Sequence, residues 1–289
     1  MKRKVNDMAI RLMVDSASDI GRQEAEQAGI IMLPIVITFG DKEYLDGVDL
    51  LPEQFYEKLI ESDELPKTSQ ISPFRFEEAF EEYTKNGDEI ILITLSSKLS
   101  GTYSGAKQAA EKFGGAVYVV DSLNACIGER LLCQYAHRLL QEGLSAKEIV
   151  EELERSKSKI NVLAVIGTLE YLKKGGRISA AAAFAGGMLS IKPVIAVIDG
   201  EVKVIGKALG SKKGNNYLNR LVEEKGGIDF TRPYGTLWSG LDKTVMEKYV
   251  RDSAHLWQEH TDSVPAYILG GTIGTHIGPG AVGVAFFQK

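Results

Sequence analysis

Short apolar runs alternate with amphipathic segments along the first half of the chain. The apolar runs predict strands, and apolar residues at helical spacing predict helices between them. The predicted strands span residues 10–16, 30–39, 89–97 and 116–122, and the predicted helices span 21–29, 52–62, 74–87 and 103–113. Strands separated by helices imply right-handed crossovers, so we expect a mainly parallel, doubly wound sheet.

Local signals support several of these helix boundaries. Pro52 stands at a predicted helix start, where its missing N–H costs nothing. Ser72 can cap the next helix, and Ser145 with Glu148 has the spacing of a capping box. The latter pair lies in a long helical stretch over residues 124–159, which we expect to join two halves of the molecule.

The second half has a different pattern. Asp199-Gly200 separates two alternating runs within residues 193–210, which is a strong signal for a hairpin and for antiparallel pairing. Further strands are predicted within 161–167, 234–240, 266–274 and 281–287, with helices between them. The sequence therefore predicts an α/β protein of two domains. Residues 1–160 would carry the parallel sheet, and residues 161–289 a mixed sheet with helices.

Composition narrows the class of protein. The 289 residues are 44% hydrophobic and 25% charged, which is typical of a globular protein with a full core. The net charge of −5 gives no general attraction to nucleic acid or to acidic membrane surfaces. No apolar run is long enough to span a membrane, and residues 1–9 lack the apolar stretch of a signal peptide.

The two cysteines add little chemistry. Cys126 and Cys133 fall in the predicted helical stretch, two turns apart and too distant to bridge. We interpret them as core thiols of a cytoplasmic protein.

Common enzyme and cofactor motifs are missing from the sequence. The stretch GPGAVG (278–283) matches G-x-G-x-x-G, but it lies too close to the end of the chain for a dinucleotide-binding unit. There is no phosphate-binding loop of the G-x-x-x-x-G-K-[ST] type and no G-x-S-x-G around Ser100. The four histidines show no metal-ligand spacing. We therefore expect no metal, no cofactor and no catalytic machinery of the chain's own.

Hydroxyl-bearing loops are the remaining candidates for a site. Thr68 and Ser69 lie between two predicted helices, whereas Ser97, Ser100 and Gly101 lie where a strand turns into a helix. Loops at the carboxyl ends of parallel strands form the ligand crevice of such sheets. A helix N-terminus also offers unpaired N–H groups to an anion.

Two other segments deserve comparison with these loops. His276 is surrounded by glycines that would let the backbone approach a ligand closely. Lys207, Lys212 and Lys213 fall together in GKALGSKKG, a cluster that is more typical of solvated surface than of an anion site.

Several motifs together resemble the DegV family of bacterial fatty-acid-binding proteins. They run in order along almost the whole chain: VDSASD (14–19), KTSQISP (67–73), LSSKLSGTYSGA (95–106), TLEYLKKGGRIS (168–179), SIKPV (190–194) and GTHIGPGAVG (274–283). The resemblance implies a two-domain α/β fold that holds one long-chain fatty acid between its domains. It also implies a partner, because some members are binding subunits of a fatty acid kinase whose acyl phosphate feeds phospholipid synthesis.

The resemblance also assigns residues. Thr68 and Ser100 would bind the carboxylate, with help from the amides around Gly101, and His276 would lie near the carboxyl group. The small, apolar segment 180–191 is a candidate wall for the acyl tail, or an ordinary core helix. A departure concerns the kinase, since members that associate with it carry an arginine in the segment GKALGSKK. Here that segment has Leu209 and Ser211 and no arginine.

Two alternatives from other classes stay open at this point. The first is a stand-alone phosphotransferase or hydrolase with Ser100 as nucleophile and His276 as base, although no third orienting residue is recognisable. The second is a regulatory or interaction protein whose small-molecule pocket is vestigial.

Overall fold

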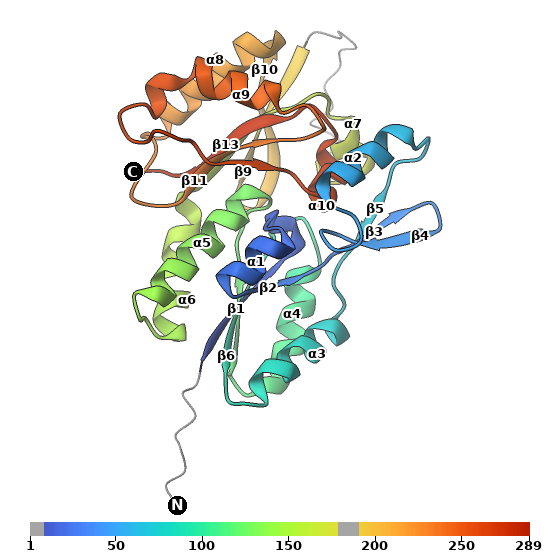
Figure 1. Ribbon diagram of the computed structural model, residues 1–289, viewed down its shortest axis with the longest axis vertical. Helices are drawn as coiled ribbons and strands as arrows, with labels where there is room; N and C mark the ends of the chain where they lie inside the picture. The colour runs from blue at the N-terminus through green and yellow to red at the C-terminus, as the bar shows by residue number, and fades with distance from the viewer. Residues whose placement is uncertain (1–8, 179–190) are drawn as a thin grey trace, which may run out of the picture.

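The computed structural model of the protein describes residues 9–178 and 191–289 (Figure 1). Its strands are β1 Ile10–Asp15, β2 Ile30–Leu33, β3 Val36–Phe39, β4 Lys42–Leu45, β5 Lys67–Ser69, β6 Glu89–Thr94, β7 Val117–Asp121, β8 Ile160–Val165, β9 Ile191–Ile198, β10 Glu201–Leu209, β11 Tyr234–Trp238, β12 Ala266–Ile268 and β13 Val282–Phe287. Its α-helices are α1 Arg22–Ala28, α2 Pro52–Glu61, α3 Pro73–Thr84, α4 Thr102–Ala110, α5 Ile127–Gln141, α6 Ala146–Ser156, α7 Glu170–Lys174, α8 Gly210–Glu224, α9 Thr244–Asp252 and α10 Gly271–Ile277.

The first sheet is parallel throughout, in the order β2-β1-β6-β7. Helices α5 and α6 pack on one of its faces and α3 and α4 on the other. Burial on both faces explains why β6 reads as a continuous apolar run, with Ile90 through Ile93 fully buried. The predicted doubly wound sheet is confirmed.

The second sheet has the order β10-β9-β8-β13-β11-β12 and is antiparallel except for its last pair. Strands β9 and β10 form the predicted hairpin, in which Asp199 and Gly200 have φ of 52° and 82°. Both values match a two-residue turn that needs positive φ at each central position. Helices α8 and α9 cover one face, while α5 packs on the other and thus lies between the two large sheets. The α/β class with a parallel and a mixed sheet is confirmed, and the domain boundary at residue 160 stays a prediction.

A third sheet, of order β4-β3-β5, was not predicted. The expected single strand over 30–39 is broken at Pro34, which has no N–H to donate to a ladder. Its first part joins the parallel sheet and its second part, β3, forms the centre of the small sheet. Residues 67–69, expected to be a loop, pair with β3 as the short edge strand β5.

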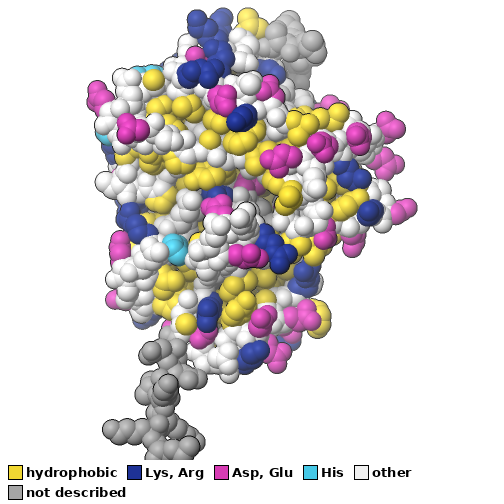
Figure 2. Space-filling model, in the orientation of Figure 1, with side chains coloured by type: hydrophobic (Ala, Val, Ile, Leu, Met, Phe, Trp, Pro, Cys, Tyr) yellow, Lys and Arg dark blue, Asp and Glu magenta, His cyan; other side chains and the backbone are white. Residues whose placement is uncertain are grey.

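The helix caps agree with the sequence. The Ser72 hydroxyl accepts a hydrogen bond from the Arg75 N–H, and Ser145 and Glu148 form the predicted capping box. Residues 180–190 of the suggested tail wall lie outside the described part of the chain. Among the residues that the structure describes, no helix has both the length and the apolar character needed to cross a membrane. On the face shown in Figure 2, basic and acidic side chains lie interspersed rather than in one broad basic field.

Candidate functional site

The order of strands in the parallel sheet reverses between β1 and β6, and their carboxyl ends are held together by Asp15. One oxygen of this buried carboxyl group accepts a hydrogen bond from the Leu95 N–H at 2.8 Å, and the other accepts from the Ala17 N–H at 2.9 Å. Burial raises the pKa of Asp15 to about 7. Ligands of open α/β sheets bind at such a reversal of strand order, and a cavity opens there.

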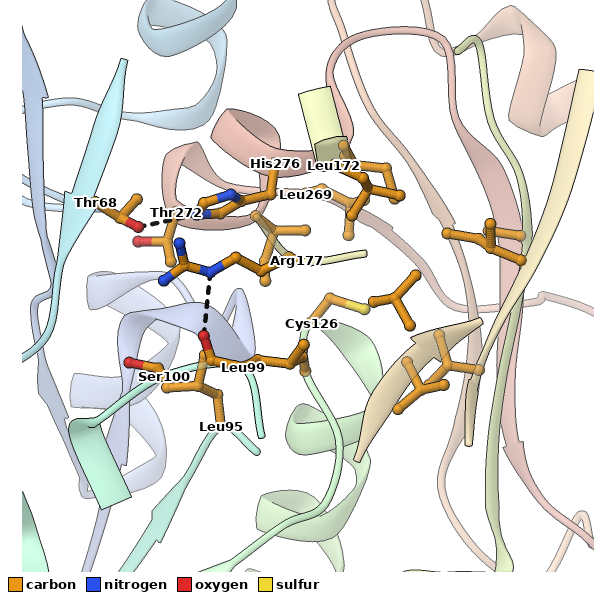
Figure 3. A pocket seen from close by; sticks show the side chains of 18 of the residues that line it. Thr68, Leu95, Leu99, Ser100, Cys126, Leu172, Arg177, Leu269, Thr272 and His276 are labelled. Atoms are coloured by element: carbon orange, nitrogen blue, oxygen red, sulfur yellow. Dashed lines mark hydrogen bonds between the residues drawn. The ribbon is translucent and has the colours of Figure 1, made fainter. Parts of the chain in front are cut away.

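The cavity extends from this edge to the α5-facing side of the mixed sheet (Figure 3). It encloses about 870 Å³ of empty space, counted out to and including its open mouth. Most of its wall is apolar and comes from Leu95, Leu99, Ala125, Cys126, Leu172, Leu269 and Ile273, and from the sheet residues Val162, Ala164, Ile195, Val197, Val202 and Leu237.

Polar side chains gather on one side of the cavity. Thr68 of β5 and His276 of α10 face one another, with 2.9 Å between Thr68 Oγ1 and His276 Nε2. Figure 3 shows the guanidinium of Arg177 between this pair and Ser100, whereas Cys126 lies between these residues and the strands of the mixed sheet. The cavity is therefore amphiphilic, with a polar end and an apolar body.

His276 is a neutral imidazole at physiological pH. Burial lowers its pKa to about 4, and the nearby positive charge of Arg177 contributes in the same direction. Its Nδ1 is buried and has no hydrogen-bond partner among the residues that the structure describes. It lies against Gly175, where an added Cβ would be 2.3 Å from that nitrogen. The sequence predicted a strand within 266–274, but only Ala266–Ile268 are a strand, and Gly271–Ile277 form α10 with His276 in its last turn.

Arg177 supplies a positive charge to the polar end. Its Nε donates to the Leu99 carbonyl at 3.1 Å, and one terminal nitrogen donates to the Gly175 carbonyl at 2.6 Å. Within residues 9–178 and 191–289, it forms no ion pair with a carboxylate. A half-buried guanidinium without a counter-ion favours an anionic ligand.

Buried acids of other segments fix the position of α10. Asp46 accepts hydrogen bonds from the Gly271 N–H at 3.1 Å and from the Thr272 N–H at 3.2 Å. Asp19, in the motif VDSASD, accepts from the Gly270 N–H at 2.6 Å. Burial raises the pKa of both carboxyl groups. These contacts satisfy three of the free N–H groups at the start of the helix and so hold His276 opposite Thr68.

The other predicted site residues occupy different positions. Ser69 and Ser100 line the cavity, and the Ser100 hydroxyl accepts from the Thr102 N–H at 3.2 Å and lies 2.9 Å from the Thr102 hydroxyl. Gly101 precedes α4, where a Cβ would collide with the Gln70 side chain, so glycine allows this close approach. Ser97 is exposed and is not among the residues that line the cavity.

The arrangement lacks the geometry of a serine nucleophile. His276 Nε2 contacts Thr68 rather than Ser100, and the described part of the chain places no carboxylate on its Nδ1. A nucleophile and base must share a hydrogen bond, and the base needs an orienting partner. In the same ranges no group of three or more His, Cys, Asp or Glu side chains could hold a metal ion.

Sequence reasoning missed several residues of the cavity, among them Arg177, Gln70, Thr272 and Cys126. Arg177 lies within a recognised motif but was not singled out, because its importance depends on having no carboxylate partner. Cys126 was expected inside a helix as a core thiol. It instead precedes α5 with φ of 49°, and its side chain lines the cavity. Both cysteines are free and buried, and burial raises the pKa of each to about 12.

Comparison with known proteins agrees with this architecture. The family model "Uncharacterised protein, DegV family" matches residues 9–289. A DegV domain-containing protein of Caldanaerobacter subterraneus is 36% identical over 284 residues, which are 97% of this chain and 99% of that protein.

Solved structures give the same result. One, of a DegV family protein from Thermus thermophilus described for its fatty acid binding, has a TM-score of 0.87 and 31% identity and covers 98% of this chain and 100% of that one. DegV of Bacillus subtilis, described as a fatty acid binding protein, has a TM-score of 0.83 and 29% identity over 98% of this chain and 100% of its own. Since the family model and the relatives span nearly the whole chain, this protein belongs to the DegV family.

Proposed function

We propose that the protein binds one long-chain fatty acid, with the carboxylate at the polar end of the cavity and the acyl chain in its apolar body. The observation that carries this proposal is the guanidinium of Arg177 beside the Thr68–His276 pair, at one side of a mostly apolar cavity. Within residues 9–178 and 191–289 this guanidinium has no carboxylate as an ion-pair partner. The related proteins of Thermus thermophilus and Bacillus subtilis are described as binding fatty acids, which supports the same ligand class.

The polar end has the donors that a carboxylate needs. If the neutral His276 carries its proton on Nε2, it donates to the Thr68 hydroxyl, which is then free to donate to a carboxylate oxygen. Ser100 and the guanidinium of Arg177 would complete the set. Charge-assisted hydrogen bonds of this kind compensate a carboxylate for leaving water.

The acyl chain would supply most of the affinity. Burial contributes roughly 0.8 kcal/mol per methylene, which is on the order of 10 kcal/mol for a full chain before ordering costs. The polar end would then fix the direction in which the acid lies and contribute a smaller share of the affinity.

Mass spectrometry of the purified protein tests this proposal. After denaturation and extraction with organic solvent, we expect a fatty acid in near-stoichiometric amount, because the acyl chain would be buried against a mostly apolar wall. A preparation without lipid should take up added fatty acid. Finding neither bound lipid nor uptake would contradict the proposal and favour a function outside lipid binding.

We also propose that the bound carboxyl group is presented to a fatty acid kinase, as the family resemblance implies. His276 lies next to the site of the proposed carboxylate, so His276→Ala should lower ATP-dependent acyl phosphate formation by the partner kinase more than it lowers fatty acid binding. Equal losses in the two assays would leave His276 no part in the transfer. The segment with Leu209, which is 56% exposed, and Ser211 has no arginine for that partner to contact.

A further inference from the structure

Three valines lie side by side on the cavity face of the mixed sheet. Val202 of β10 is paired with Val197 of β9. Because Leu163 of β8 is paired with Ala196, Val162 falls next to Val197 on the following strand. All three line the cavity, and we refer to Val162, Val197 and Val202 as the valine row.

The valine row lies away from the polar end. Strand β8 runs toward the segment that carries Leu172 and Arg177, so Val162 is farther along the strand from that segment than Ala164. On β9 and β10 the row is next to the hairpin turn at residues 199 and 200. Figure 3 likewise shows the strands of the mixed sheet on the opposite side of Cys126 from Thr68.

Backbone closes the space behind the valine row. An added Cβ on Gly128, in the first turn of α5, would lie 2.5 Å from a methyl group of Val162, so the helix backbone packs directly on that side chain. The hairpin turn is held as well, because the buried Ser96 hydroxyl donates to the Gly200 carbonyl at 2.7 Å. A Cβ on Gly200 would lie 3.3 Å from the Leu123 side chain, so little space remains there.

We propose that the valine row is the end wall of the acyl cavity and sets the length of the fatty acid that the protein prefers. This inference rests on the proposed function. β-Branched side chains on a paired strand have few rotamers. Unlike methionine or leucine side chains, they cannot change rotamer to make room for a longer acyl chain. Each methylene that fits should raise affinity about fourfold, and methylenes beyond the wall should add nothing.

The test is the dissociation constant of a homologous series of saturated straight-chain fatty acids, each one methylene longer than the last. For the wild type we expect affinity to rise with length and then stop rising at a break point. Val202→Ala removes two methyl groups and should move the break point toward longer acids by about two methylenes. Val202→Leu adds one carbon and should move it toward shorter acids by about one methylene.

Val204→Ala is the matched control. Val204 lies two residues further along β10, on the same face and paired with Ile195, but it is not among the residues that line the cavity. Its break point should equal that of the wild type. Thermal melting of each variant shows whether it folds. If Val202→Ala does not fold, Val202→Leu still tests the position of the break point.

The outcomes separate the inference from the proposed function. A break point that stays in place in both Val202 variants overturns the end wall, even if affinity falls equally for every acid. A wild-type protein that binds no acid of the series overturns the proposed function itself.

Discussion

Replacing Gly283 by alanine is expected to destabilise the fold strongly. Gly283 lies in β13, between β8 and β11, and an added Cβ would lie 2.3 Å from the Leu163 carbonyl oxygen and 2.9 Å from the Ala164 Cβ. The obstacle is mainly backbone of a paired strand, so the clash cannot be relieved by a side-chain rotation. We expect a loss of about 3 kcal/mol in the free energy of unfolding, or a melting temperature lower by roughly 6–12 °C.

Gly21→Ala is the control for this substitution. Gly21 also has a negative φ, and an added Cβ there would meet no atom within 4 Å. The same chemical change should therefore alter stability by less than about 1 kcal/mol. If Gly283→Ala melts with the wild type in calorimetry or circular dichroism, strands β8 and β13 can separate more easily than their close packing suggests.

The parts of the fold that could be predicted are those specified by neighbouring residues. Asp199-Gly200 predicts a hairpin because both residues tolerate the positive φ that its turn demands. The central strands β1 and β6 could be recognised because most of their residues are buried and apolar. Ser145 and Glu148 interact within one helical turn, so their spacing alone was sufficient to predict the capping box.

The third sheet could not be predicted because its strands are held by distant partners. β4 and β5 contain three or four residues each, are mostly exposed, and form a sheet only by pairing with β3. Such short, polar segments carry no periodic apolar signal. Residue Thr68 was selected for its hydroxyl, but its place on a strand opposite His276 depends on this pairing.

The candidate site shows the same limit. Ser100 could be selected because it follows a strand and precedes a helix. Arg177 could not, because what distinguishes it among the described arginines is a half-buried position without an ion pair, which only the folded chain determines. Asp46 could not be selected from the sequence either, because the helix that it caps begins at residue 271, far away in the chain.

The double substitution Thr68→Ala with Ser100→Ala is expected to weaken fatty acid binding by about a hundredfold or more. Hydrogen bonds to a charged group contribute about 1.5–3 kcal/mol each, so losing two corresponds to about 3 kcal/mol at least. Burial of the acyl chain is on the order of 10 kcal/mol, so weak binding should persist. The measurement is the dissociation constant for one saturated fatty acid, by calorimetry or fluorescence displacement, with thermal melting to show that the fold survives.

Ser97→Ala is the matched control for that experiment, because Ser97 is an exposed serine of the same loop that does not line the cavity. It should bind as the wild type does.

The pH dependence of binding is a second test of these roles. The pKa of His276 is lowered to about 4, so its imidazole stays neutral unless the pH falls toward that value. The ratio of variant to wild-type affinity should therefore stay constant between about pH 6 and pH 8. A ratio that changes there would mean that a titrating group at the cavity, His276 or Asp15 with its pKa of about 7, acts on the bound carboxylate. Unchanged affinity in the double variant would refute the assignment of Thr68 and Ser100.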